Sequence, residues 1–143
     1  MEKQVKELTV DATLDNLDTV VGFVEDTLGM TSCPMKLCMQ MVLCMEELFV
    51  NVANYAYEGT TGTCTIYLET QHTDEEGKVT ITLEDYGRPF NPLEKEDPDI
   101  TLSADERQIG GLGIFMVKKS MDTVSYNYEN EKNRLTLEKA WCI

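Results

Sequence analysis

Three groups of residues in this 143-residue sequence have the types and spacing that ligand chemistry needs. The first lies in the segment EELFVNVANYAY, where Glu47, Asn51 and Asn54 recur at positions i, i+4 and i+7. On a helix these positions share one face, so a carboxylate and two amides could converge on one ligand. The solvated outer face of an ordinary helix would show the same spacing. The apolar neighbours Leu48 and Tyr55 favour a stripe that is covered rather than solvated.

The second group follows an alternating apolar pattern in the segment KVTITLEDYGRPF. Apolar residues alternate up to Leu83, and continuing the pleat places Asp85 on the same inward face. A buried carboxylate is costly unless hydrogen-bond donors reach it. Gly87, two residues later, would let a backbone or a flat ligand come close. The same residue types are also common where a strand ends in a turn, so both interpretations remain open for this segment.

The third group is the glycine cluster in ERQIGGLGIFMVKKSMD, with Gly110, Gly111 and Gly113 ahead of a helical apolar run. Free amide N–H groups and the positive end of the helix dipole together bind phosphate at such a helix start. The cluster is not followed by the G-K-[S/T] of a P-loop, and no strand precedes it as a dinucleotide-binding fingerprint requires. On its own, a simple junction between a loop and a helix would look the same.

The periodicity of the chain predicts which elements position these groups. It predicts strands over 3–10, 63–71, 78–86 and a hairpin over 123–141, with helices over 11–30, 34–57 and 111–122. Gly29 is expected to cap the first helix. Strands grouped as hairpins favour an α/β two-layer sandwich, a mixed and mostly antiparallel sheet covered on one face by three helices, in a single domain over 1–143. Residues 91–111 lack a clear element, which is typical of a functional lid.

Composition narrows the class of protein. The formal net charge of −14, from 26 acidic and 12 basic residues, argues against a nucleic-acid or anionic membrane surface. The chain shows no run of about 18 apolar residues and no signal-peptide pattern, so we expect a cytoplasmic protein. Five cysteines without a C-x-x-C pair, and the single histidine, predict no zinc site.

Taken in order, the three motifs resemble those of the Bergerat-type ATPases, the superfamily of DNA gyrase, the large heat-shock chaperones, sensor histidine kinases and MutL. Residues 47–54 resemble the N box of that superfamily, residues 85–90 its first glycine box and residues 110–113 its second. Within it, the small size and the segments EELFVNVANYAY, DYGRPFNP and GGLGIFMVKKSMD are similar to the RsbW-like anti-sigma-factor serine kinases. The resemblance covers nearly the whole chain.

The resemblance implies a role for each motif residue. Asn51 would bind a Mg²⁺ ion that bridges the phosphates of ATP, with Asn54 as a further cofactor-binding residue, and Glu47 would be the general base. Asp85 would accept a hydrogen bond from the adenine amino group, and Gly87 would make room for the ring. The remaining role, holding the phosphates through backbone amides, falls to Gly110, Gly111, Leu112 and Gly113.

The sequence also departs from the family. Tyr55 stands where many of these kinases have a histidine, and Asn133 stands where a Gly-Thr pair often precedes the final strand, with Thr136 just beyond. The final strand therefore gives no basis for predicting adenine contacts. Arg88 and Arg107 are candidates for contacts with the phosphates.

The implied function is an ATP-binding anti-sigma regulator with serine/threonine protein kinase activity. Its partners would be an anti-anti-sigma protein of STAS type, a sigma factor, and a second copy of the chain in a homodimer. The alternative is a nucleotide-dependent protein-binding switch without kinase activity. The catalytic half of a histidine kinase is disfavoured, because no dimerising histidine helix precedes the motifs.

Overall fold

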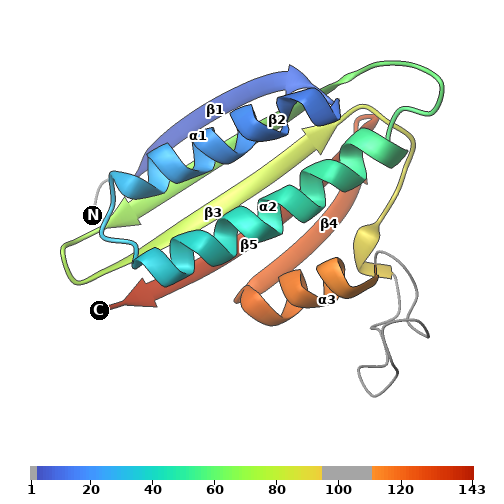
Figure 1. Ribbon diagram of the computed structural model, residues 1–143. Helices are drawn as coiled ribbons and strands as arrows, with labels where there is room; N and C mark the ends of the chain where they lie inside the picture. The colour runs from blue at the N-terminus through green and yellow to red at the C-terminus, as the bar shows by residue number, and fades with distance from the viewer. Residues whose placement is uncertain (1–2, 95–110) are drawn as a thin grey trace.

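A computed structural model describes residues 3–94 and 111–143 and shows one five-stranded sheet with its helices on one face (Figure 1). The sheet order is β1-β2-β3-β5-β4, and every neighbouring pair is antiparallel. The strands are β1 (Gln4–Asp11), β2 (Thr63–His72), β3 (Glu76–Asp85), β4 (Thr123–Glu129) and β5 (Lys132–Cys142). The predicted two-layer sandwich is confirmed. Its sheet is antiparallel throughout rather than mixed, because the antiparallel pair of helices after β1 returns the chain in the opposite direction.

The helical layer contains three α-helices in the described part of the chain. These are α1 (Leu17–Gly29), α2 (Met35–Tyr55) and α3 (Gly111–Ser120), with 3-10 turns η1 (Leu14–Asn16) and η2 (Pro92–Glu94). The expectation that Gly29 caps α1 is wrong. Gly29 is the last helical residue, and the amide of Met30 closes the helix by donating to the carbonyl of Thr27 at 3.3 Å, without a left-handed residue.

The core lies between the sheet and the helices. Alternate residues of the three central strands point inward and are buried, as Ile66, Ile81 and Leu137 illustrate. Helix α2 meets them with Met45 and Phe49, both completely buried. By length and composition alone α2 could also cross a bilayer. Its burial on the sheet accounts for the same composition, because one whole side of the helix belongs to the core.

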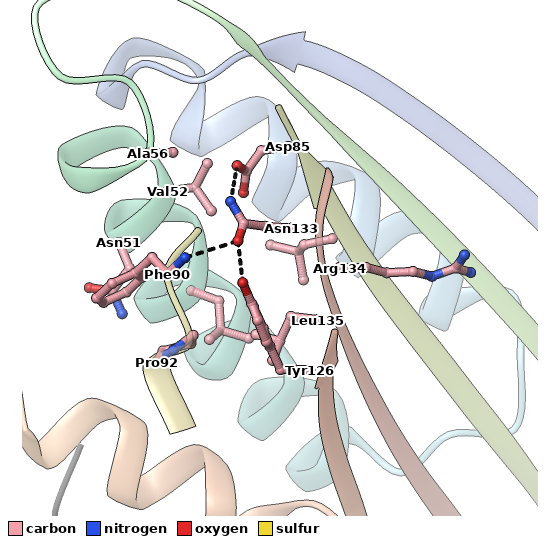
Figure 2. A pocket seen from close by; sticks show the side chains of 12 residues that line it. Asn51, Val52, Ala56, Asp85, Phe90, Pro92, Tyr126, Asn133, Arg134 and Leu135 are labelled. Carbon is pink, nitrogen blue, oxygen red and sulfur yellow. Dashed lines mark hydrogen bonds between the residues drawn. The ribbon is translucent and has the colours of Figure 1, made fainter. Parts of the chain in front are cut away.

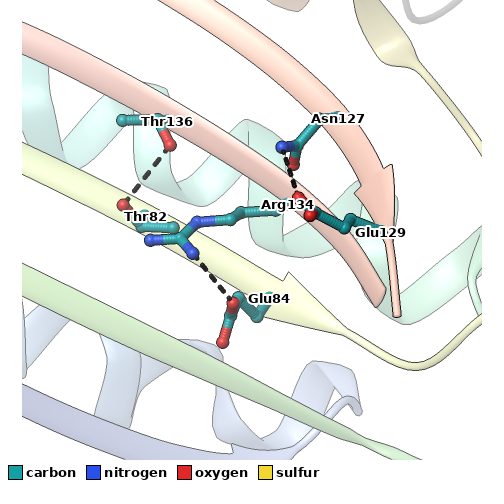
Figure 3. Close-up of polar contacts among 6 residues, drawn as sticks. All are labelled: Thr82, Glu84, Asn127, Glu129, Arg134 and Thr136. Carbon is teal, nitrogen blue, oxygen red and sulfur yellow. Dashed lines mark hydrogen bonds and ion pairs between the residues drawn. The ribbon is translucent and has the colours of Figure 1, made fainter. Parts of the chain in front are cut away.

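The opposite face of the sheet carries polar side chains (Figure 3). On it Thr82 and Thr136 form a hydroxyl–hydroxyl hydrogen bond of 3.4 Å, and Arg134 pairs with Glu84 at 3.6 Å. These pairs follow from the register, which sets Thr82 opposite Thr136 and Glu84 opposite Arg134. The alternate residues of the same strands therefore face the helices, and any site between sheet and helices is built from them.

The last hairpin has a two-residue turn. Asn130 and Glu131 separate β4 from β5, and both have left-handed backbone, with φ of 55° and 63°. Two left-handed residues form the turn whose twist matches a tight antiparallel hairpin. The turn fixes the register of β5, which brings Asn133 opposite Tyr128 on one side and opposite Asp85 on the other.

Candidate nucleotide-binding site

Asp85 ends β3 on its inward face, as the alternation of the strand predicts, and only 5% of it is exposed. One carboxylate oxygen, Oδ1, accepts hydrogen bonds from the Gly87 amide and from Nδ2 of Asn133, both at 2.9 Å. Burial raises the pKa of Asp85, while these two hydrogen bonds act in the opposite direction. Asp85 is therefore a buried acceptor whose position is fixed by two donors.

The residues after β3 form hydrogen bonds with the C-terminal end of α2. The Arg88 amide and its Nε donate to the carbonyls of Ala56 and Tyr55, each at 3.0 Å, and its guanidinium pairs with Glu58 at 3.0 Å. A Cβ atom on Gly87 would overlap the carbonyl of Ala56. In this structure Gly87 is thus required for close packing on α2, and Arg88 satisfies helix carbonyls rather than standing free for phosphates. The predicted role of Gly87 beside an adenine ring stays a prediction.

Asn51 lies on α2 and faces the same cavity as Asp85. Its side-chain Nδ2 is buried, and no residue that the structure describes forms a hydrogen bond with it. A buried polar atom without a partner is uncommon in proteins and is expected where a ligand completes the site. The amide oxygen of the same group is a suitable ligand for Mg²⁺. Asn54, one turn further, is exposed and lies outside the cavity lining, so its predicted role stays a prediction.

Glu47 and the glycine motif meet where α3 begins. A Cβ atom on Gly113 would overlap Cδ and Cγ of Glu47, so the missing side chain is what lets the carboxylate lie against the first turn of α3. That turn starts at Gly111, as predicted, and carries no acidic residue of its own. Its amides are the unpaired donors that a helix N-terminus offers to an anion. Gly110 and the side chain of Leu112 lie outside the described residues, as do Arg107 and most of the predicted lid over 91–111.

An open cavity lies between the end of β3, helix α2 and the last hairpin (Figure 2). Its space is about 450 Å³ when the solvent at its mouth is included. Figure 2 shows Asn133 between Asp85 and Tyr126, with its oxygen also facing the backbone of Phe90. The lining residues are Leu48, Asn51, Val52, Ala56, Leu83, Asp85, Phe90, Pro92, Tyr126, Asn133, Arg134 and Leu135.

The structure brings together part of the predicted set, and the cavity is also lined by three residues to which the sequence had assigned no role. Asn51 and Asp85 line one cavity, and Glu47, one helical turn before Asn51, contacts Gly113. The additions are Phe90, Tyr126 and Asn133. The sequence signal for Asn133 was its place in the final hairpin, where the family often has a different pair. No comparable signal marked Tyr126.

An antiparallel sheet under three helices, with a buried acid at the end of one strand and a glycine-started helix beside a carboxylate, agrees with the ATPase fold that the motifs predict. The family model of the histidine kinase-like ATPase domain matches residues 10–139, and the chain belongs to that family. Because such a domain implies ATP binding, the cavity is the candidate site for the nucleotide.

A curated relative makes the assignment more specific. The chain is 30% identical over 98 residues to the serine/threonine-protein kinase BtrW of Bordetella bronchiseptica. The match covers 68% of this chain and 66% of that relative, slightly less than two thirds of its length. The similarity to RsbW-like ATPases inferred from the motifs is thereby confirmed.

Proposed function

We propose that the protein is an ATP- and Mg²⁺-dependent protein serine/threonine kinase of the cytoplasm that acts as an anti-sigma regulator. Its substrate would be a serine on an anti-anti-sigma partner of STAS type, and its second partner would be a sigma factor, with a homodimer as the working unit. The relative named as a serine/threonine-protein kinase supports phosphoryl transfer. The observation that carries the proposal is the contact of Glu47 with Gly113 in the first turn of α3, next to the cavity that Asp85 and Asn51 line.

Each group has one task in binding. Asp85 accepts a hydrogen bond from the amino group of the purine, because it is a buried acceptor that two donors hold in place at the cavity. Asn51 offers its amide oxygen to Mg²⁺, and its Nδ2, which forms no hydrogen bond within residues 3–94 and 111–143, can donate to the ligand. The first-turn amides of α3 receive the phosphates. When bound, Mg²⁺ would neutralise charge that develops on the phosphate oxygens.

Glu47 is the candidate general base. Its carboxylate is half-buried, and within the described part of the chain no hydrogen bond engages it. It can therefore take the proton of a serine hydroxyl as the serine oxygen bonds to the γ-phosphorus of ATP and ADP leaves. Positioning a carboxylate for such a proton transfer contributes about 10²- to 10⁴-fold in rate.

The test compares Glu47→Ala with its neighbour Glu46→Ala. Glu46 lies about 100° around the same helix and should not replace Glu47. Each variant is mixed with Mg·ATP and a STAS-type partner; phosphoserine is measured by mass spectrometry and ATP binding by calorimetry. We expect Glu47→Ala to lose phosphoserine by at least about 10²-fold and keep ATP, and Glu46→Ala to keep both.

Two outcomes would contradict the proposal at different levels. A wild-type protein that binds ATP and regulates its partner but forms no phosphoserine would be a nucleotide-dependent switch, and kinase activity would be rejected. A wild-type protein that does not bind millimolar Mg·ATP would reject the nucleotide site itself.

A further inference from the structure

Asn133 is a buried side chain at the cavity, with 6% of the residue exposed, and both ends of its carboxamide form hydrogen bonds. Its Nδ2 donates to Oδ1 of Asp85 at 2.9 Å and to the Arg88 carbonyl at 2.7 Å, with a longer contact of 3.4 Å to the Gly87 carbonyl. Its Oδ1 accepts from the Phe90 amide at 3.0 Å and from the Tyr126 hydroxyl. Both ends of one carboxamide are thus used to join β5, β4 and the segment after β3 (Figure 2).

The two carboxylate oxygens of Asp85 differ in their hydrogen bonding. Oδ1 accepts hydrogen bonds from the backbone amide of Gly87 and from the side-chain amide of Asn133. Oδ2 receives no hydrogen bond from the residues that the structure describes, and Asp85 faces the cavity. A carboxylate offers about four lone-pair positions, so the acceptor capacity that remains is concentrated on Oδ2. A ligand in the cavity therefore meets a single available oxygen.

A different role for Asn133 would be to block the site, with its amide group in the place of a ligand amino group. A blocking side chain has to leave when the ligand arrives. Moving Asn133 would break its bonds to Asp85, Arg88, Phe90 and Tyr126 together. Removing buried polar groups from their partners is costly, because each group then lacks both its partner and water. The bonding therefore favours a side chain that remains in place when the ligand is bound.

We propose that Asn133 is a positioning residue that selects adenine over guanine by engaging Oδ1 of Asp85 and leaving Oδ2 for one N–H group. Adenine offers a single exocyclic amino group at this edge. Guanine offers two neighbouring donors, its ring N–H and its amino group, and pairs best with a carboxylate that has both oxygens free. This inference rests on the proposed nucleotide site and adds the origin of its base preference.

The test compares Asn133→Ala, Asn133→Thr and Asn127→Ala. Threonine can still donate from its hydroxyl to Oδ1, whereas alanine cannot. Asn127 is exposed on β4, and its side chain donates to Glu129 on the opposite face of the sheet, so the same substitution there is a matched control (Figure 3). Binding of ATP and of GTP is measured by calorimetry, and folding is checked by circular dichroism.

We expect Asn133→Ala to bind ATP about ten- to a hundredfold more weakly and to lose much of its preference for ATP over GTP. Asn133→Thr should recover most of the preference, and Asn127→Ala should match the wild type. A second measurement is the pH dependence, because removing the Asn133 hydrogen bond raises the pKa of Asp85 further. As the pH is lowered, ATP binding by Asn133→Ala should therefore begin to weaken at a higher pH than ATP binding by the wild type.

The experiment distinguishes failure of the proposed function from failure of the proposed role of Asn133. If the wild type does not bind ATP, the proposed function fails before Asn133 is tested. If it prefers ATP and Asn133→Ala keeps the same affinity and preference, or binds ATP more tightly, the positioning role is overturned. If Asn133→Ala does not fold, Asn133→Thr decides alone: a folded threonine variant that has lost the preference for ATP overturns the inference.

Discussion

Substituting Gly87 with alanine tests whether the segment after β3 must pack directly on the end of α2. The added Cβ would overlap the carbonyl oxygen, the carbonyl carbon and the Cβ of Ala56. Two of these are backbone atoms, which cannot rotate away as the end of a flexible side chain can. The segment would have to move off the helix, and the hydrogen bond from the Arg88 amide to the Ala56 carbonyl, now 3.0 Å, would lengthen or break.

The expected loss of stability has two parts. Forcing an extra carbon into a packed contact costs about 1–3 kcal/mol. Weakening a backbone hydrogen bond adds about 1 kcal/mol. We therefore expect a decrease of about 2–4 kcal/mol in the free energy of unfolding. With an unfolding entropy of about 2.1 cal/mol/K per residue, this corresponds to a Tm lower by about 7–13 °C for a chain of this length.

Gly22→Ala is the matched control. Gly22 lies inside α1, and a Cβ added there would meet no atom within 4 Å. Alanine is the better helix former, so this variant should gain up to about 1 kcal/mol. Both variants are compared with the wild type by urea and thermal unfolding, followed by circular dichroism. If Gly87→Ala unfolds within about 0.5 kcal/mol of the wild type, the close packing of Gly87 on Ala56 is refuted.

Two further substitutions test the electrostatics of the site and the strain of the last hairpin. Because burial raises the pKa of Asp85, the ionised carboxylate opposes folding above that pKa. Asp85→Asn should therefore abolish ATP binding, stabilise the nucleotide-free protein near about pH 7, and lose this advantage towards about pH 4, where the wild type takes up its proton. Urea unfolding at both pH values measures the difference, and a variant less stable than the wild type at the higher pH would contradict the prediction. Glu131 has φ of 63°, which costs a non-glycine residue about 1 kcal/mol; Glu131→Gly should raise the stability by about 0.5–1 kcal/mol, and an unchanged or lower Tm would show that this turn is not strained.

Local periodicity was sufficient to predict the helices and strands, and to predict which of them carry the candidate site residues. The alternation that ends at Asp85 placed the acid on the buried face of β3, where the structure has it. Helical spacing put Glu47 and Asn51 on one helix, and the glycine cluster predicted a helix start at Gly111. These features depend on neighbouring residues, so one sequence is enough to predict them.

Contacts between distant parts of the chain could not be predicted in the same way. The bond between Asp85 and Asn133 joins residues that are 48 positions apart, and it exists because the register of β5 sets them opposite each other. A shift of that register by one residue would turn Asn133 to the other face of the sheet. The overlap that Gly87 avoids likewise depends on where α2 ends, which helical spacing fixed only to within two residues.

The contacts around the cavity divide the site into two parts that different elements hold. The segment from Asp85 to Phe90 is bonded to the end of α2 through Arg88 and to β5 through Asn133, so the part that would receive the base is fixed by the fold itself. The part that would receive the phosphates depends instead on the contact between Glu47 and Gly113. Changes at Asp85 or Asn133 should therefore act mainly on nucleotide affinity and preference. Changes at Glu47 should act mainly on turnover, because removing a group that interacts only in the transition state lowers the rate without weakening binding.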